Sequence, residues 1–303
     1  MSKAISPSSQ RPYGLARVLR VWKIARSSIY YQRKSQSPER LGRPPRRRGP
    51  KGVWSDEALV ARIKHVLATS PWVGEGHRKV WAMLRHRDVR TSRRRVLRLM
   101  RENNLLAPTR RGRVRGPWVH DGTIIPDRPD AMWGIDASSV MTVSGQVTVF
   151  ILVDHCTGEC LGIHAARRGT RFEALECVRQ AVRSSFGGFG KDIAKDAQLK
   201  LRHDHGSQFI SHAFQEEIAF LGIESSPSFV RAPEGNGCAE RFIRTLKEQL
   251  LWIRRFESVE DLLDALQSFR IRFNQQRIMQ RHDYRTPAQQ RRRLLEQPTE
   301  SAA

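Results

Sequence analysis

The chain has 303 residues, of which 39% are hydrophobic, enough to bury the cores of two or three small domains. No uninterrupted apolar stretch reaches the roughly 18 residues that a membrane span needs, and no apolar segment follows the first basic residues as in a secretory leader. Four cysteines are too few for a disulfide scaffold, which fits a reducing compartment. Together these features lead us to expect a cytoplasmic protein without a membrane partner.

The formal net charge of +24 is unevenly distributed along the chain. Residues 1–120 contain 30 Lys and Arg against 6 Asp and Glu, whereas the remaining residues contain 24 of each kind. An excess of this size at one end predicts a polyanionic partner, and nucleic acid is the natural one. A plain solvated basic surface is the alternative, and charge by itself does not separate DNA from RNA.

Residues 1–32 are expected to form a short helical N-terminal segment. Leu15, Val18 and Leu19 recur at helical spacing among basic residues. Both a short helix-turn-helix remnant and a single amphipathic helix docked on another subunit fit this pattern. Residues 33–54 are rich in Pro, Gly and Arg with almost nothing apolar, which predicts a basic linker whose side chains neutralise phosphates.

Residues 55–107 have the pattern of three short helices. Ser55 is a predicted N-cap of the first helix, and Thr91 or Ser92 a predicted N-cap of the third. The third helix carries a series of arginines, which favours a helix-turn-helix whose last helix enters a major groove over a bundle with a solvated basic face. The predicted DNA-binding residues here are Arg93, Arg94, Arg95 and Arg98.

The composition changes after a second basic linker at residues 108–130. Residues 131–256 contain three strand-like runs (MWGIDA, GQVTVFILVD and ECLGIHA), a helix, a further strand, a helix, and a last helix that opens near Asn236. This order predicts an α/β domain, a mixed sheet flanked by helices, preceded by the small all-α region. Residues 257–303 are expected to form a C-terminal helix, from Val259 to Gln275, and a basic tail.

Three acids in residues 131–256 form the candidate catalytic site. Asp136 lies in the first strand-like run, Asp204 ends the fourth, and Glu240 is on the helix that opens near Asn236. Phosphoryl transfer on a nucleic-acid backbone needs an activated hydroxyl and a stabilised phosphate, which two divalent metal ions supply together. Because Mg²⁺ prefers oxygen ligands, we expect these carboxylates to hold two such ions.

The Glu240 helix also carries two cations on the same face. Glu240, Arg244 and Lys247 have i, i+4, i+7 spacing, so Arg244 and Lys247 are predicted to contact DNA phosphates next to the acid. An ordinary surface ladder of charges is the alternative. The adjacent apolar face is predicted to pack on the sheet; its residues are Ile243, Leu246, Leu250 and Ile253. The loop just before this helix, from Pro233 to Gly237, is either flexible or a plain turn.

Other polar groups are weaker candidates. A zinc site is imaginable, but the spacing lacks paired ligand motifs and favours buried cysteines and turn histidines; its residues would be His155, Cys156, Cys160 and His164. Asp154 ends the second strand, but Asp136 is preferred as the first acid because it lies in the first strand of the domain. His205, next to Asp204, either orients a nucleophile or is a turn residue.

The segments WGIDA, RHDHGSQF and EGNGCAERFIRTLKE together resemble the retroviral-integrase-like core of bacterial DDE transposases. Thirty-five residues separate Asp204 from Glu240, and Lys247 follows seven residues after the Glu, as in that pattern. GEGHRKVWAMLRHRDVRTSRRRVLRLMRENNLLAP is similar to the helix-turn-helix region of the IS-three family of insertion sequences, and FNQQRIMQRHDYRTPAQ to its closing segment. The chain resembles the second reading-frame product of that family, OrfB.

This resemblance implies an RNase H-like fold, Mg²⁺ or Mn²⁺ dependence, and cleavage and strand transfer of double-stranded DNA at element ends into a target. It also implies a bacterial, nucleoid-associated protein, a homo-oligomer on DNA and an upstream OrfA-type partner. The sequence departs from the family pattern at His205, after the second acid, and at Ala137 and Ser138, after the first. A nuclease that only hydrolyses and a non-catalytic DNA-binding regulator are the alternatives.

Overall fold

The computed structural model describes residues 3–35, 53–108, 124–228 and 236–296. The chain divides into two compact units, Met1–Val53 and Trp54–Ala303. The first contains helices α1 (Leu15–Val21) and α2 (Arg26–Ser35), so the N-terminal segment is a pair of helices and not one amphipathic helix. Among the described residues, no helix has both the length and the apolar character that crossing a membrane demands.

The second unit begins with the three predicted helices, α4 (Asp56–Thr69), α5 (His77–Arg85) and α6 (Arg93–Glu102). Ser55 and Ser92 are confirmed as N-caps, because their side chains accept hydrogen bonds from the N–H of Ala58 and Arg95. The apolar faces of the three helices meet in one cluster; its fully buried members include Leu59, Ile63, Val80, Val96 and Met100.

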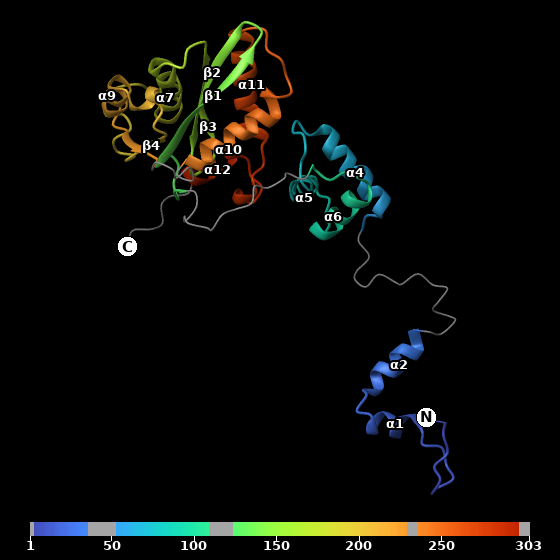
Figure 1. The fold of residues 1–303 in the computed structure, drawn as a ribbon. Helices are drawn as coiled ribbons and strands as arrows, with labels where there is room; N and C mark the ends of the chain where they lie inside the picture. The colour runs from blue at the N-terminus through green and yellow to red at the C-terminus, as the bar shows by residue number, and fades with distance from the viewer. Residues whose placement is uncertain (1–2, 36–52, 109–123, 229–235, 297–303) are drawn as a thin grey trace. The chain divides into compact units, whose positions relative to one another are not determined.

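The rest of the second unit is built on a five-stranded mixed sheet (Figure 1). The strands are β1 (Met132–Thr142), β2 (Gly145–Asp154), β3 (Cys160–Ala166), β4 (Lys200–His203) and β5 (Glu224–Pro227). Their order is β3-β2-β1-β4-β5, with β1, β2 and β3 antiparallel and β4 and β5 parallel to β1. This is the RNase H-like arrangement that the resemblance implied.

Strand β5 was not predicted from the sequence. Its residues, Glu-Ser-Ser-Pro, have neither the β-branched side chains nor the alternation that indicate a strand. The segment is extended because its backbone pairs with β4 at the edge of the sheet, where a proline is tolerated.

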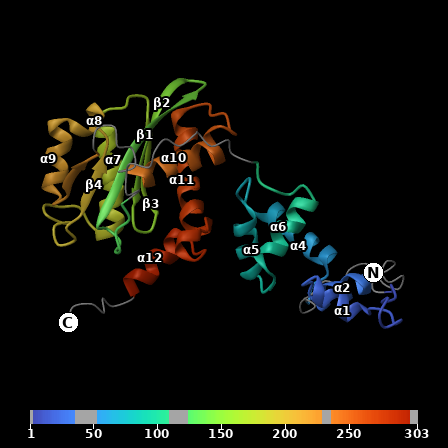
Figure 2. The same cartoon turned by 60° about the horizontal axis from the view of Figure 1, so that its bottom comes forward.

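Helices cover both faces of the sheet, as Figures 1 and 2 show. One face packs against α7 (Arg171–Phe186), α8 (Ser207–Ile210) and α9 (His212–Phe220). The other packs against α10 (Gly237–Leu246) and α11 (Val259–Gln276). Alternate residues of β2 point to opposite faces, so Phe150 and Leu152 join the first cluster while Ile151 and Val153 join the second. Strands that bury both faces read as continuous apolar runs, which explains the composition of β2.

The C-terminal segment is more structured than the predicted basic tail. After α11 come a 3-10 turn (Gln280–His282) and helix α12 (Pro287–Glu296). The guanidinium of Arg291 on α12 forms an ion pair with Asp130 and lies 3.6 Å from Glu159 and 3.8 Å from Asp154. These ion pairs attach α12 to the sheet domain.

Candidate active site

Asp136 on β1 lies near Asp204, the residue directly after the neighbouring parallel strand β4. In the register of β1 and β4, Met132 pairs with Lys200 and Gly134 with Arg202. The same register continued by two residues sets Asp136 opposite Asp204, which directly follows β4. The sequence predicted both strands, but only their parallel pairing brings the two carboxylates to one place.

Glu240 is exposed in the first turn of α10, which packs across β1 and β2. The start of this helix is fixed to β1, because the Nδ2 of Asn236 donates a hydrogen bond of 3.0 Å to the carbonyl oxygen of Ile135. Ile135 is the residue immediately before Asp136. This contact therefore joins the start of the helix that carries Glu240 to the strand residue before Asp136.

A groove of about 500 Å³ joins these acids to the cations of α10. Its lining residues are Asp136, Ala137, Ser138, Glu240, Ile243, Arg244, Lys247, Glu248 and Trp252. The predicted helical spacing of Glu240, Arg244 and Lys247 is confirmed, since all three line the same groove. Asp204 is exposed beside Asp136 and is not among the lining residues.

The electrostatics of the groove centre on Asp136. Its pKa is raised to about 6, mainly because burial disfavours the charged carboxylate and also because Asp204 and Glu240 carry like charges nearby. The N–H of Ala137, which donates to the Asp136 carboxylate at 2.8 Å, and the ammonium of Lys247 act in the opposite direction. The three predicted acids thus interact electrostatically.

The donor set fits a divalent metal ion by its chemistry. All three acids supply carboxylate oxygens, and their mutual repulsion at Asp136 is the kind of interaction that a cation relieves. In the described part of the chain, no three His, Cys, Asp or Glu side chains are placed so that together they could hold a metal ion. The three carboxylates are therefore the right kind of ligand for a divalent ion and lie in one region, but they do not form a preassembled metal site.

His205 is held by a structural contact. Its Nε2 lies 2.8 Å from the carbonyl oxygen of Ser228, just beyond β5, while the Asp204 carboxylate accepts a 2.9 Å hydrogen bond from the N–H of Gly206. The imidazole ties the end of β4 to the end of β5. This contact favours the turn-residue interpretation of His205 over a direct role with the nucleophile.

The C-terminal continuation of α10 differs from the sequence prediction. Leu246 and Leu250 are buried as expected, but the prediction that Ile253 packs on the sheet is wrong, since Ile253 is 65% exposed. Residues Lys247–Leu251 form a π-helical turn, which changes the face on which every later residue lies. The same turn brings Trp252, which the sequence did not single out, to the groove.

The α6 arginines divide into two groups. Arg93 and Arg94 are exposed, and the Arg93 guanidinium lies 4.8 Å from the centre of the Trp81 ring. Arg95 and Arg98 instead form ion pairs of 2.6 and 2.7 Å with Asp56 on α4. These two side chains hold α6 against α4, and the DNA contact predicted for all four stays a prediction.

Residues around Asp154 form a structural cluster away from the groove. Asp154 is fully buried and accepts hydrogen bonds from the N–H and the hydroxyl of Thr157. His155 lies 3.0 Å from the carbonyl of Ile124, and His164 lies 2.7 Å from Glu173. All four cysteines are buried thiols. The potential zinc ligands thus have separate partners, and Asp136 rather than Asp154 lies in the groove.

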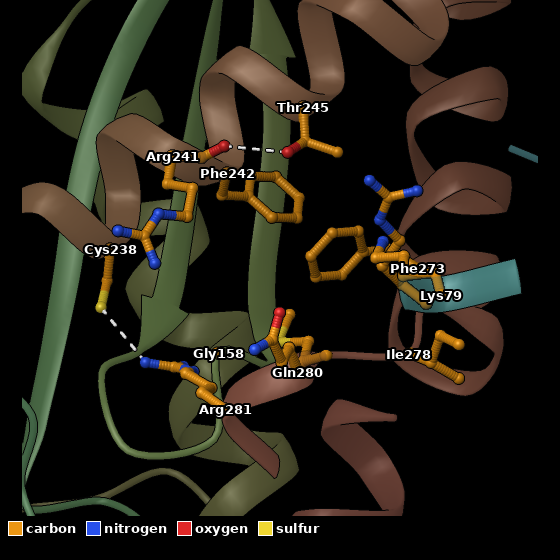
Figure 3. A pocket seen from close by; sticks show the side chains of 12 residues that line it. Lys79, Gly158, Cys238, Arg241, Phe242, Thr245, Phe273, Ile278, Gln280 and Arg281 are labelled. Carbon is orange, nitrogen blue, oxygen red and sulfur yellow. Dashed lines mark hydrogen bonds between the residues drawn. The ribbon is translucent and has the colours of Figure 1, made fainter. Parts of the chain in front are cut away.

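A second cavity of about 500 Å³ lies on the other side of α10 (Figure 3). Phe242 and Phe273 form its apolar wall, with ring centroids 4.7 Å apart, and Arg241 and Arg281 line it with positive charge. Arg281 donates to the carbonyl of His155 at 3.3 Å. None of the predicted site residues lines this cavity. Helix α10 therefore separates a groove with the acids from a cavity whose lining holds no acid among the described residues.

Comparisons with known proteins agree with this architecture. An HTH-like domain model matches residues 54–113, and two integrase core domain models match residues 126–233 and 221–287. An Escherichia coli insertion element IS2A protein of 48.2 kDa is 25% identical over 82% of the chain, which spans 58% of that relative's length. The Escherichia coli transposase InsD for insertion element IS2A/D/F/H/I/K is 25% identical over 80% of the chain and 79% of its own length.

Among solved structures, the HTLV-2 integrase catalytic core domain in complex with magnesium is 21% identical and covers 54% of this chain and 96% of its own, with a TM-score of 0.41. The chain is an integrase-core protein. It has an RNase H-like sheet, integrase core models match that part of the chain, and an HTH-like region precedes it. Within that class, the two curated relatives are insertion-element proteins, so the chain is similar to the IS2 transposases.

Proposed function

We propose that the chain is a DDE-type polynucleotidyl transferase that cleaves double-stranded DNA at the ends of an insertion sequence and joins them to target DNA. The observation that carries this proposal is the shared groove, which Asp136 and Glu240 line together with Arg244 and Lys247, and Asp204 lies near Asp136. A groove lined by both acids and cations suits a DNA strand. Its reacting phosphate would lie at the acids, and the adjacent phosphates would contact the cations.

Asp136, Asp204 and Glu240 are the residues that would hold two Mg²⁺ or Mn²⁺ ions. When bound, the ions supply activation of the attacking hydroxyl and stabilisation of charge on the phosphate. Lys247, whose charge acts on Asp136, and Arg244, which is 60% exposed and bonded to Glu248 at 3.0 Å, would hold the neighbouring phosphates. Water attacks the phosphorus at the element end, and the P–O bond to the 3′ oxygen breaks to leave a 3′-OH and a 5′-phosphate. The freed 3′-OH then attacks a phosphorus of target DNA, and the 3′ oxygen of the target strand leaves.

The basic helical region supplies DNA binding in this proposal. Arg93 and Arg94 on α6 are exposed for phosphate or base contacts, and Arg95 and Arg98 add positive charge while fixing the helix. Action at two element ends implies a homo-oligomer on DNA, and an upstream OrfA-type polypeptide would be a further partner. We place the protein in the bacterial cytoplasm with the nucleoid.

The substitution Asp204→Asn tests the proposal. It removes one carboxylate charge with little change in shape, so cleavage and joining of end-containing DNA in Mg²⁺ should be lost while DNA binding is retained. Asp196→Asn, at another exposed acid, should leave both activities intact. Unimpaired joining by Asp204→Asn would refute the proposed role. Hydrolysis without joining by the wild-type chain would identify a nuclease instead, and binding without any cleavage a regulator.

A further inference from the structure

Trp252 is a large aromatic side chain at the groove that no step of the proposed reaction uses. It lines the groove together with Asp136, Glu240 and Lys247, and it is 69% exposed. Tryptophan is on average well buried in folded proteins, so an indole exposed this far is unusual. The groove around it carries mainly charged side chains, so the ring does not cover an apolar surface of its own domain.

The backbone explains how Trp252 reaches the groove. Residues Lys247–Leu251 form a π-helical turn, and the N–H of Trp252 donates to the carbonyl oxygen of Lys247 at 2.9 Å, five residues earlier. In a regular α-helix of 3.6 residues per turn, a residue five positions later lies roughly 140° further around the axis. A π-helical turn is wider, so the fifth residue lies much closer in angle to the earlier one. Trp252 therefore shares the face of Lys247 and Glu240.

The turn is fixed by packing against the sheet. Leu246, at its start, is fully buried, and Leu250, within it, is only 7% exposed. π-helical turns are rare and occur frequently at functional sites. The apolar anchors hold the backbone while the indole remains uncovered, so the ring is presented to the groove in advance of any ligand.

We propose that Trp252 forms a nucleobase-binding subsite of the groove, on which an unpaired base next to the reacting phosphate stacks. The inference rests on the proposed function, since it takes a DNA end as the ligand. An exposed aromatic ring can stack on a base of any type. The base must present a free face, which it does only when it is not already stacked on a neighbouring base pair. Lys247, which lines the groove with Trp252, holds the phosphate of the same nucleotide. The subsite thus selects frayed or single-stranded ends over intact duplex.

Binding measured without cleavage tests this subsite. The probe is a short duplex with a single-stranded 3′ overhang containing 2-aminopurine, and the reference is the same duplex with blunt ends, both in EDTA with the full chain. Trp252→Ala should weaken binding of the overhang probe by about 5- to 150-fold, the range for loss of one stacked base, with little effect on the blunt duplex. It should also restore 2-aminopurine fluorescence that stacking on the indole quenches.

Two further variants make the result specific. Trp252→Phe keeps a stacking face and should retain most of the preference for the overhang. Ile253→Ala alters an adjacent side chain of similar exposure that does not line the groove, and it should behave as wild type. Equal binding of both probes by wild type and Trp252→Ala, or the same loss in Ile253→Ala, would overturn the subsite. Because these measurements need no cleavage, they are independent of the Asp204→Asn result.

Discussion

The side chain of Asn236 donates to the carbonyl oxygen of Ile135 across 3.0 Å, although a hundred residues separate them in the sequence. Asn236 is only 5% exposed and precedes α10, which carries Glu240, while Ile135 precedes Asp136 on β1. This buried hydrogen bond, together with the packing of α10 on the sheet, therefore fixes the relative position of the two acids that line the groove.

Substitution of Asn236 should impair the reaction more than DNA binding. Asn236→Ala leaves the Ile135 carbonyl without this donor in a buried place, which costs about 1–3 kcal/mol of stability. The start of α10 should then lose its fixed position, so cleavage in Mg²⁺ should fall while affinity for DNA stays near wild type. Asn103→Ala is a matched control, because the Asn103 side chain also donates to a backbone carbonyl, that of Leu99, but is exposed. A wild-type cleavage rate in Asn236→Ala would contradict the coupling.

The glycine at position 134 should be required for the same contact. A Cβ at Gly134 would lie 2.6 Å from both the Oδ1 of Asn236 and the Nε2 of His155, so these side chains would have to move. Gly134→Ala is expected to lower the unfolding free energy by about 1–3 kcal/mol, as overpacking does, and to reduce cleavage like Asn236→Ala. Gly190→Ala, with nothing within 4 Å of the added Cβ, should change neither quantity. Urea unfolding and DNA cleavage assays compare the two.

Asp154 should make stability depend on pH. Burial raises its pKa in the folded protein to about 6, above the value of 3.8 for a free side chain. The folded protein therefore binds this proton more tightly than the unfolded chain. The contribution of Asp154 to stability is fully present below about pH 3.8 and is lost as the pH rises through 6, at up to about 1.4 kcal/mol per pH unit.

The variant Asp154→Asn should lack this part of the pH dependence. Urea unfolding of wild type and variant at several values between pH 4 and 7 measures it, and the difference between the two curves isolates Asp154 from other acids. The wild-type unfolding free energy should rise relative to the variant as the pH is lowered through this window. Parallel curves for the two proteins would contradict the assignment.

Two arginines on α6 should have separable effects. Arg94 is exposed, so Arg94→Ala should weaken DNA binding and reduce the dependence of log affinity on log salt by about one unit, with stability changed by less than about 0.5 kcal/mol. Arg98 pairs with Asp56 at 2.7 Å, so Arg98→Ala should mainly lower the melting temperature, by the modest amount expected for a partly exposed pair. Salt titrations of DNA affinity and thermal melts test both; the reverse pattern would show that Arg98 is the DNA contact.

Local sequence patterns were sufficient for most elements of this chain. Ser55 and Ser92 start their helices because a cap acts on residues two or three positions away, and β2 was recognised because its run is rich in Val, Ile and Phe. The shared face of Glu240, Arg244 and Lys247 followed from helical spacing alone. The difference in charge between the basic residues 1–120 and the neutral remainder of the chain is likewise a property of composition.

Tertiary structure decided which of these local pieces meet. The parallel register of β1 and β4 sets Asp136 opposite Asp204, and it depends on pairing between segments nearly seventy residues apart. Strand β5 exists because β4 offers its edge, and the π-helical turn that brings Trp252 to the groove is anchored by packing of Leu246 and Leu250 on the sheet. A sequence pattern reports what each residue prefers beside its neighbours in the chain, whereas these features are fixed by contacts between residues that only folding brings together.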